Sequence, residues 1–192
     1  GQFDNAKPLF NEIHQLPGNK YYYDANYYLG FLSYRDRDYN EALKSFQKVE
    51  TIPKYRALVP YYIAQIYYFQ GNQDKALSYG ESKLSQNDVY YRKDLSLLMG
   101  QVYFEKKEFS KALPLLESYV KSNDKVSKEV MYELSYCYYN ANMIDKAIEG
   151  FKQLSNEKDS LGQNSMYLLG DLYLKTNQKT NTRNAFLYST DN

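Results

Sequence analysis

The chain has 192 residues, and its 24 Lys and Arg residues against 23 Asp and Glu residues give a net charge of +1. This near-neutral balance argues against a nucleic-acid partner, since phosphate neutralisation requires a basic field. No apolar run is long enough for a membrane-spanning helix, so membrane insertion is not expected, and the single cysteine excludes an internal disulfide.

Helices of two alternating kinds are predicted along the chain. The first kind carries a large apolar residue followed by a small one, and these helices are expected at 23–36, 57–70, 93–106, 128–141 and 163–176. The second kind carries an alanine near its start, and these helices are expected at 3–16, 39–51, 73–86, 109–122, 144–156 and 180–189.

Two columns of small residues carry the repeat. The column in the first helices advances by 34, 36, 35 and 35 residues through Gly30, Ala64, Gly100, Ser135 and Gly170. The column in the second helices keeps the same register through Ala42, Ala76, Ala112 and Ala147. Small residues at fixed places let two helices approach closely while large neighbours fill the remaining space, so the pattern predicts stacked helical hairpins.

The ends of these helices are predicted from capping chemistry. An N-cap residue type stands two places before each alanine position, at Asp4, Asn40, Asp74, Ser110, Asp145 and Thr180. The apolar residues just before four of them occupy the expected hydrophobic-staple position. A left-handed turn residue is expected at Gly71, Asn142 and Asn177. Two other repeats carry Arg37 and Lys107 at the equivalent position, and neither residue type prefers this conformation.

The columns resemble the tetratricopeptide repeat over nearly the whole chain. The residues that carry the resemblance are Leu29-Gly30, the aromatic pairs Tyr67-Tyr68 and Tyr138-Tyr139, Ala42 with Phe46, and Pro53. The chain departs from the family pattern in having no Trp, in running one or two residues long in several repeats, and at Gly80 and Thr182. The pentatricopeptide repeat, an RNA reader of similar period, is disfavoured by the neutral charge and the alanine column.

The resemblance implies an all-α fold, a right-handed superhelical α-solenoid of about 11 helices in antiparallel pairs. The chain is expected to form a single array with a half-repeat at 1–22, full repeats at 23–56, 57–92, 93–127 and 128–162, and a degenerate terminal repeat at 163–192. Because helical repeats need polar caps at their ends, we expect this array to be a fragment of a longer protein, or its ends to pair with another copy.

The resemblance also implies that the first helices line a concave groove. The fifth and ninth positions of each repeat are the expected peptide-binding residues, and they are Tyr27, Phe31, Tyr61, Gln65, Leu97, Gln101, Tyr132, Tyr136 and Tyr167. Aromatic walls bury ring area against a peptide at low entropic cost. Tyr34, Tyr68 and Tyr139, at the twelfth position, are interpreted as packing residues instead.

The sequence offers little material for catalysis. His14 is the only histidine and is interpreted as a packed or solvated residue, and Cys137 lies between two tyrosines as expected for a buried structural thiol. There is no glycine-rich phosphate loop, because Gly71 and its neighbours form a helix–helix turn. We therefore expect no enzyme activity, no cofactor and no metal site.

The predicted function is a protein–protein interaction scaffold that holds a peptide or protein segment in the aromatic groove. The alternative is a structural assembly module of a bacterial envelope or secretion complex that uses the array ends or the convex face, including self-association. The long polar turns and the endings at Phe46–Val49 and Phe151–Leu154 resemble bacterial cell-envelope members of the family. The compartment stays open between the periplasm or envelope, which this resemblance favours, and the cytoplasm.

Overall fold

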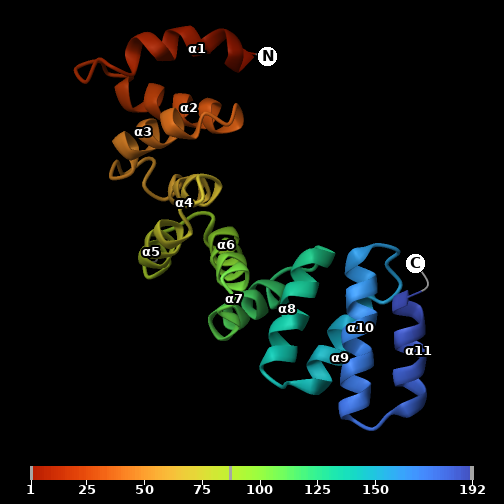
Figure 1. Ribbon diagram of the computed structural model, residues 1–192. Coiled ribbons are helices and arrows are strands. Elements are labelled where there is room, and N and C mark those ends of the chain that lie inside the picture. The colour runs from red at the N-terminus through yellow and green to blue at the C-terminus, as the bar shows by residue number, and fades with distance from the viewer. Residues whose placement is uncertain (1, 87, 191–192) are drawn as a thin grey trace. The chain divides into compact units, whose positions relative to one another are not determined.

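The computed structural model describes residues 2–86 and 88–190, and the described chain is all-α (Figure 1). Its eleven helices are α1 (Gln2–Ile13), α2 (Tyr22–Arg35), α3 (Tyr39–Val49), α4 (Pro60–Phe69), α5 (Gln73–Leu84), α6 (Arg92–Glu105), α7 (Phe109–Lys121), α8 (Lys128–Asn140), α9 (Ile144–Leu154), α10 (Ser160–Lys175) and α11 (Lys179–Thr190). They follow one another as antiparallel pairs, which confirms the predicted fold class.

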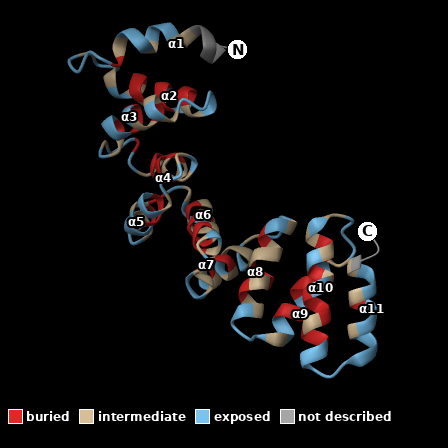
Figure 2. Cartoon of the chain, in the orientation of Figure 1, coloured by how far each residue is buried: buried red, intermediate tan, exposed pale blue. Residues whose placement is uncertain are grey.

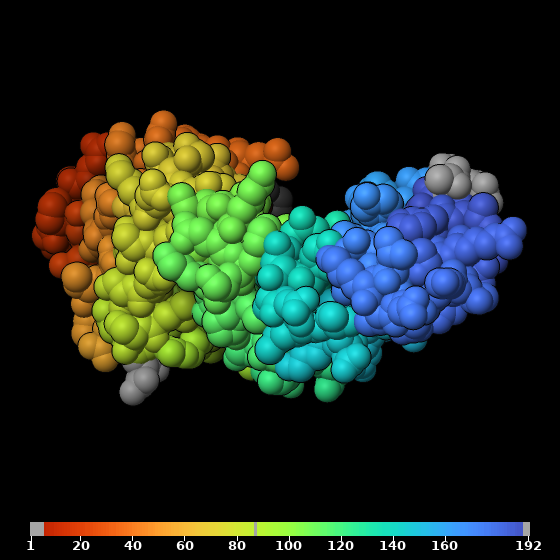
Figure 3. Space-filling view, turned by 60° about the horizontal axis from the view of Figure 1, so that its bottom comes forward, coloured from red at the N-terminus to blue at the C-terminus, as the bar shows by residue number. Residues whose placement is uncertain are grey.

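The helices belong to two compact units, residues 1–99 and 100–192, with the boundary inside α6. In the first unit, α2 pairs with α3 and α4 with α5, and in the second, α8 pairs with α9 and α10 with α11. The successive hairpins of the first unit lie directly side by side, from red to yellow in Figure 3. Buried residues follow the helix faces that meet within each unit, and the residues on the opposite faces are exposed (Figure 2).

The small residues of the first helices allow a ring of the second helix to approach closely within a hairpin. A Cβ atom added to Gly30 would lie 2.8 Å from a ring carbon of Phe46, and one added to Gly170 would lie 2.5 Å from the ring of Phe186. In both hairpins the ring stands four residues after the alanine-column position and lies over the glycine of the first helix. The glycine therefore supplies the space that the ring fills.

Gly80 stands four residues after Ala76, where the repeats of Ala42 and Ala147 carry Phe46 and Phe151, and the space beside it is filled by another route. A Cβ atom at Gly80 would lie 2.3 Å from the sulfur of Met99, which is fully buried on α6. The methionine of the following helix thus occupies the volume that an aromatic ring takes in other repeats. Met is well suited to this place because its unbranched chain fits irregular gaps.

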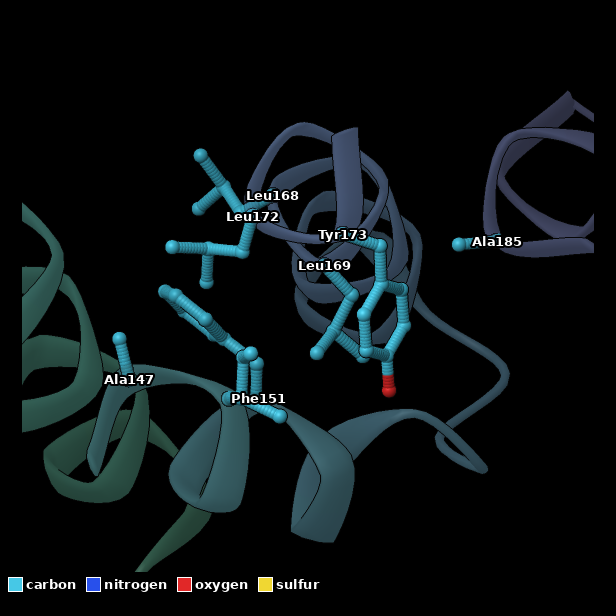
Figure 4. Packing of buried hydrophobic residues seen from close by; sticks show 8 residues of the cluster. Ala147, Phe151, Leu168, Leu169, Leu172, Tyr173 and Ala185 are labelled. Atoms are coloured by element: carbon cyan, nitrogen blue, oxygen red, sulfur yellow. The ribbon is translucent and has the colours of Figure 1, made fainter. Parts of the chain in front are cut away.

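The core of the second unit is built around Phe151 of α9, which is completely buried. Its ring points toward Leu168 and Leu172 of α10, while Ala185 of α11 lies on the far side of α10 (Figure 4). Neighbouring helices thus bury one another's apolar faces, as expected of tandem repeats.

The helix ends differ from prediction where proline intervenes. Helix α1 ends at Ile13 rather than at residue 16, because Pro17 disfavours helical backbone in the residue before it. Helix α4 begins at Pro60 rather than at residue 57, since proline lacks an N–H and is favoured at the first helical position.

The tight turns inside the hairpins share one backbone conformation. The left-handed residue has φ between 56° and 75° in all five turns, at Arg37, Gly71, Lys107, Asn142 and Asn177. In the α2–α3 turn, the N–H of Asp38 donates to the carbonyl of Ser33 at 2.8 Å and that of Arg37 to the carbonyl of Tyr34 at 3.0 Å. These two bonds define a Schellman motif, which confirms the predicted turn.

The predicted N-caps were wrong by two residues. The cap residues are Asp38, Asn72, Glu108 and Met143, and only the Asp38 side chain accepts a hydrogen bond from the helix that it caps. The predicted residues lie within the first turn, so the apolar residues Tyr39, Phe109 and Ile144 before them occupy the first helical position rather than a staple. Because the residue that ends the Schellman motif is also the next cap, the backbone conformation sets these helix starts. Asp4 lies inside α1, and its side chain is outside the described residues.

Arg37→Gly and Lys107→Gly are each expected to raise the free energy of unfolding by about 1 kcal/mol, because a side chain in the left-handed region clashes with its own backbone. Asn142→Gly is the matched control and should gain less, since Asn tolerates this region. Urea denaturation followed by circular dichroism measures all three. Equal or lower stability of both glycine variants would contradict the strain argument.

Candidate functional site

Aromatic side chains gather on the first helices of the first unit. We call the set Tyr27, Phe31, Tyr34, Tyr61 and Gln65 the unit-1 face. The ring of Tyr27 stacks on Tyr55 with centroids 4.5 Å apart, and the ring of Phe31 meets Tyr62 edge-on at 5.8 Å. Phe31 remains 41% exposed, whereas the other four are half-buried, so Phe31 is the residue of this face most open to a partner.

A hydrogen-bonded relay connects α2 to α4 across this face. The Tyr34 hydroxyl donates to Gln65 Oε1 at 2.6 Å, and Gln65 Nε2 donates to the Tyr61 hydroxyl at 2.8 Å. Burial raises the pKa of Tyr34 and of Tyr27, so these phenols stay neutral at physiological pH. The relay holds the side chains of neighbouring repeats in register, so the unit-1 face is uncharged and pre-organised along these three residues.

The second unit has a related face with one important difference. We call the set Gln101, Phe104, Tyr132, Glu133 and Tyr136 the unit-2 face. Tyr136 meets Phe104 edge-on at 5.7 Å and lies 6.1 Å from Tyr132. Gln101 Nε2 donates to the two carboxylate oxygens of Glu133 at 3.1 and 3.3 Å. The unit-2 face therefore combines rings with a carboxylate, which the unit-1 face lacks.

The structure brings several predicted groove residues together, but not all of them. Tyr61 and Gln65 share the relay, and Tyr132 lies beside Tyr136 on α8. Gln101 of α6 is hydrogen-bonded to Glu133, which is also on α8. The last two members of the predicted set are Leu97, half-buried on α6, and Tyr167, whose ring is 59% exposed on α10 and packs on Phe186.

The tyrosines interpreted as packing residues are engaged within the chain. Tyr34 belongs to the relay, and the Tyr139 hydroxyl donates to Asp171 Oδ2 at 2.6 Å. A bond to this carboxylate raises the pKa of Tyr139, and Lys175 opposes it. These bonds fit a structural role at the twelfth position.

Glu133 is the residue of the unit-2 face that sequence reasoning missed. Burial raises the pKa of its carboxyl to about 7, the Gln101 hydrogen bond opposes this, and the negative charges of Glu105 and Glu129 add to it. The signal was available in the sixth position of each repeat, where the other first helices carry Tyr or Leu. Comparing the residues at this position between repeats shows Glu133 as the one carboxylate among Tyr and Leu.

Glu133→Gln is expected to raise the free energy of unfolding by about 2 kcal/mol at about pH 8 and to leave it unchanged at about pH 4. The folded-state pKa lies above the ordinary value of 4.5, so the stability that protonated Glu133 contributes is complete below about pH 4.5 and is lost as the pH rises through about 7. Urea denaturation of both proteins across this range measures the effect. A difference that does not change with pH would contradict it.

The residues considered for catalysis are packed into the fold. Cys137 is buried, and burial raises the pKa of its thiol to about 12, so the thiolate is not available as a nucleophile. His14 is also buried, and its Nδ1 lies 2.8 Å from the carbonyl oxygen of Asn11. Within residues 2–86 and 88–190, no group of three His, Cys, Asp or Glu side chains is placed to hold a metal ion. Over the same residues, no helix has the length and apolarity needed to cross a membrane.

Antiparallel hairpins in tandem, with rings on the first helices, define an α-helical repeat protein. Residues 129–158, which include most of α8 and all of α9, match the family profile described as Tetratricopeptide repeat. The search of curated proteins found no match in sequence.

Solved structures extend this likeness to the rest of the chain. YrrB, described as a TPR protein with an unusual peptide-binding site, is similar with a TM-score of 0.77 and 20% identity, over 97% of this chain and 93% of that chain. MamA (AMB-1) gives a TM-score of 0.74 with 17% identity over 90% of this chain and 92% of that one. MamA (MSR-1) gives 0.65 with 18% identity over 88% and 94%. The chain therefore has the fold of tetratricopeptide-repeat proteins, and residues 129–158 match the profile of one such repeat.

Proposed function

We propose that this protein is a non-enzymatic scaffold that binds an extended peptide or protein segment along the first helices. The observation that carries the proposal is the pre-organised aromatic surface, in which Tyr34, Gln65 and Tyr61 are hydrogen-bonded across two repeats beside the partly exposed ring of Phe31. Side chains already fixed before binding lose little entropy when a partner arrives, so ring area there contributes efficiently to affinity.

Two further observations support a protein partner. Tetratricopeptide repeats commonly serve as protein-binding scaffolds, and YrrB, of the same fold, has a peptide-binding site. The near-neutral net charge provides no general attraction for nucleic acid.

The test is a selection of binding peptides from a phage-displayed random library, followed by affinity measurements with fluorescein-labelled copies. Tyr61→Ala should weaken the binding of peptides that use the unit-1 face by at least about tenfold, and Tyr132→Ala should do the same for peptides that use the unit-2 face. Tyr188→Ala, which removes a ring 65% exposed on α11, is the control and should leave affinity unchanged.

Circular dichroism of each variant establishes that the helices remain formed. If both groove variants bind the selected peptides as the wild type does, the peptides use another surface and the proposal is wrong.

A second candidate, a structural assembly module, is favoured by exposed apolar side chains on the terminal helices. Leu9 and Leu16, in and just after α1, and Leu187 with Tyr188 on α11, are each more than half exposed. Apolar side chains there could join this chain to another copy. Sedimentation of the wild type against Leu9→Ser and Leu187→Ser separates the candidates, since only the assembly candidate predicts a mass above the monomer that these changes abolish.

A further inference from the structure

The sixth position of the first helices is a packing column with one exception. Leu98 and Leu168 are more than nine-tenths buried there, Tyr62 is half-buried, and Tyr28, which is 39% exposed, stacks on a ring of α1. Glu133 occupies the same register in the fourth repeat and is itself half-buried. A carboxylate in such a column must be desolvated to enter it, and an apolar residue would have fitted the pattern without that penalty.

Nothing in the described second unit neutralises Glu133. Its hydrogen-bond partner is the uncharged amide of Gln101, and the charges that act on it are the carboxylates of Glu105 on α6 and Glu129 on α8. Lys128, the lysine nearest in sequence, instead pairs with Glu157 at 3.2 Å and with Asp159. Within residues 100–190, no Lys or Arg forms an ion pair with Glu133.

Aromatic rings stand one helical turn away along the same seam between α6 and α8. Phe104 is three residues after Gln101, Tyr136 is three residues after Glu133, and their two rings are in edge contact at 5.7 Å. Residues three apart on a helix are neighbours on one face. The seam therefore presents a carboxylate next to two rings, which are the two groups that attract an ammonium or guanidinium ion.

We propose that the unit-2 face selects a segment carrying a lysine or arginine side chain, which Glu133 receives beside the rings of Phe104 and Tyr136. The inference rests on the proposed function and names the chemical class of the partner. A planar guanidinium fits best, because it can take both carboxylate oxygens while its flat face lies against a ring. The unit-1 face places the neutral relay of Gln65 at the related site, so we expect no such preference there.

The proposal predicts that binding depends on pH. A cation beside Glu133 favours the ionised carboxyl and returns its pKa from about 7 to the ordinary range or below. Binding then expels the proton that free Glu133 holds at lower pH. Affinity should therefore rise by about tenfold between about pH 6 and about pH 8, while the charge of a lysine or arginine stays constant over this range.

The experiment uses the full chain and the library selection described above, carried out in parallel on the wild type and on Glu133→Gln. Peptides selected by the wild type should be enriched in arginine and lysine, and this enrichment should be absent with Glu133→Gln. A selected arginine peptide is then compared with its citrulline version, which keeps the shape and removes the charge. Citrulline should weaken binding to the wild type by about tenfold and hardly change binding to Glu133→Gln. Glu149→Gln, the same change at an exposed site on α9, is the matched control and should behave as the wild type.

The outcomes separate this inference from the proposed function. If the wild type selects peptides without basic enrichment, and Glu133→Gln binds them equally well, the inference is overturned while the scaffold proposal stands. If the change from arginine to citrulline weakens binding equally in the wild type and in Glu133→Gln, the cation is recognised elsewhere and the inference is again wrong. If no peptide is selected at all, the proposed function fails and the inference fails with it.

Discussion

Phe46→Ala is expected to lower the free energy of unfolding by about 4 kcal/mol, the largest effect of any single change discussed for this chain. Phe46 is completely buried, stacks on Tyr62 with centroids 5.6 Å apart, and lies over Gly30. Its removal leaves a cavity at the place where α2, α3 and α4 meet, and the backbone of a paired hairpin cannot collapse far enough to fill it. Phe31→Ala, which removes a ring 41% exposed in the same unit, should cost about 1 kcal/mol or less.

A second change makes the test of this packing specific. In the wild type, Gly30→Ala places a methyl group 2.8 Å from the Phe46 ring and should cost about 2 kcal/mol through overpacking. In the Phe46→Ala background the ring is gone, so the same change should stabilise the protein by about 1 kcal/mol through the higher helix propensity of alanine. Urea denaturation of the four proteins measures this coupling. If Gly30→Ala has the same effect in both backgrounds, the two residues do not share the space that the structure assigns to them.

Gly162→Ala is expected to lower the free energy of unfolding by about 3 kcal/mol. The added Cβ atom would lie 1.9 Å from the backbone carbonyl oxygen of Glu157, and a backbone atom cannot move aside as a flexible side chain can. The turn before α10 would have to shift. That shift would break the cap in which Asp159 Oδ1 accepts from the N–H groups of Leu161 and Gly162 at 3.0 and 3.1 Å.

Gly18→Ala is the control for this prediction, because a Cβ atom at Gly18 would meet no atom within 4 Å. It should be neutral or slightly stabilising, since alanine reduces the freedom of the unfolded chain. Thermal and urea denaturation of both variants provide the comparison. A Gly162→Ala protein as stable as Gly18→Ala would show that the turn accommodates the methyl group and that the close approach is not a constraint.

Most of the fold could be predicted from the sequence, because a helical hairpin is specified by residues close to one another in the chain. The spacing of Gly30 and Ala42 predicted the hairpins, and the turn residues Gly71 and Asn142 predicted where each would reverse. Even Arg37 and Lys107, which lack the preference, adopt the left-handed turn, since the flanking helices determine the conformation there. The N-caps were misplaced because a Schellman turn supplies the next cap through its backbone, independent of the side-chain type.

The candidate site was less predictable, since it depends on contacts between repeats. The positions of Tyr61, Gln65, Tyr132 and Tyr136 on the first helices followed from the register, but which of them share hydrogen bonds did not. Binding by this set stays a prediction. Glu133 was overlooked because a single glutamate on a helix is ordinary. It becomes unusual only when it is compared with the Tyr and Leu residues at the same position of the other repeats, and when α6 is seen to bring it an amide and no cation.

By itself, the sequence determined the repeat period, the alternation of two helix types and the left-handed turns, because each depends on local backbone preference and on apolar spacing. Only the tertiary structure decided that Met99 fills the space at Gly80, that Gln65 joins tyrosines of two repeats, and that Glu133 is half-buried without a counter-ion. These features arise where side chains about one repeat or less apart in sequence meet, so their energies depend on three-dimensional packing and desolvation rather than on the order of residues along one helix.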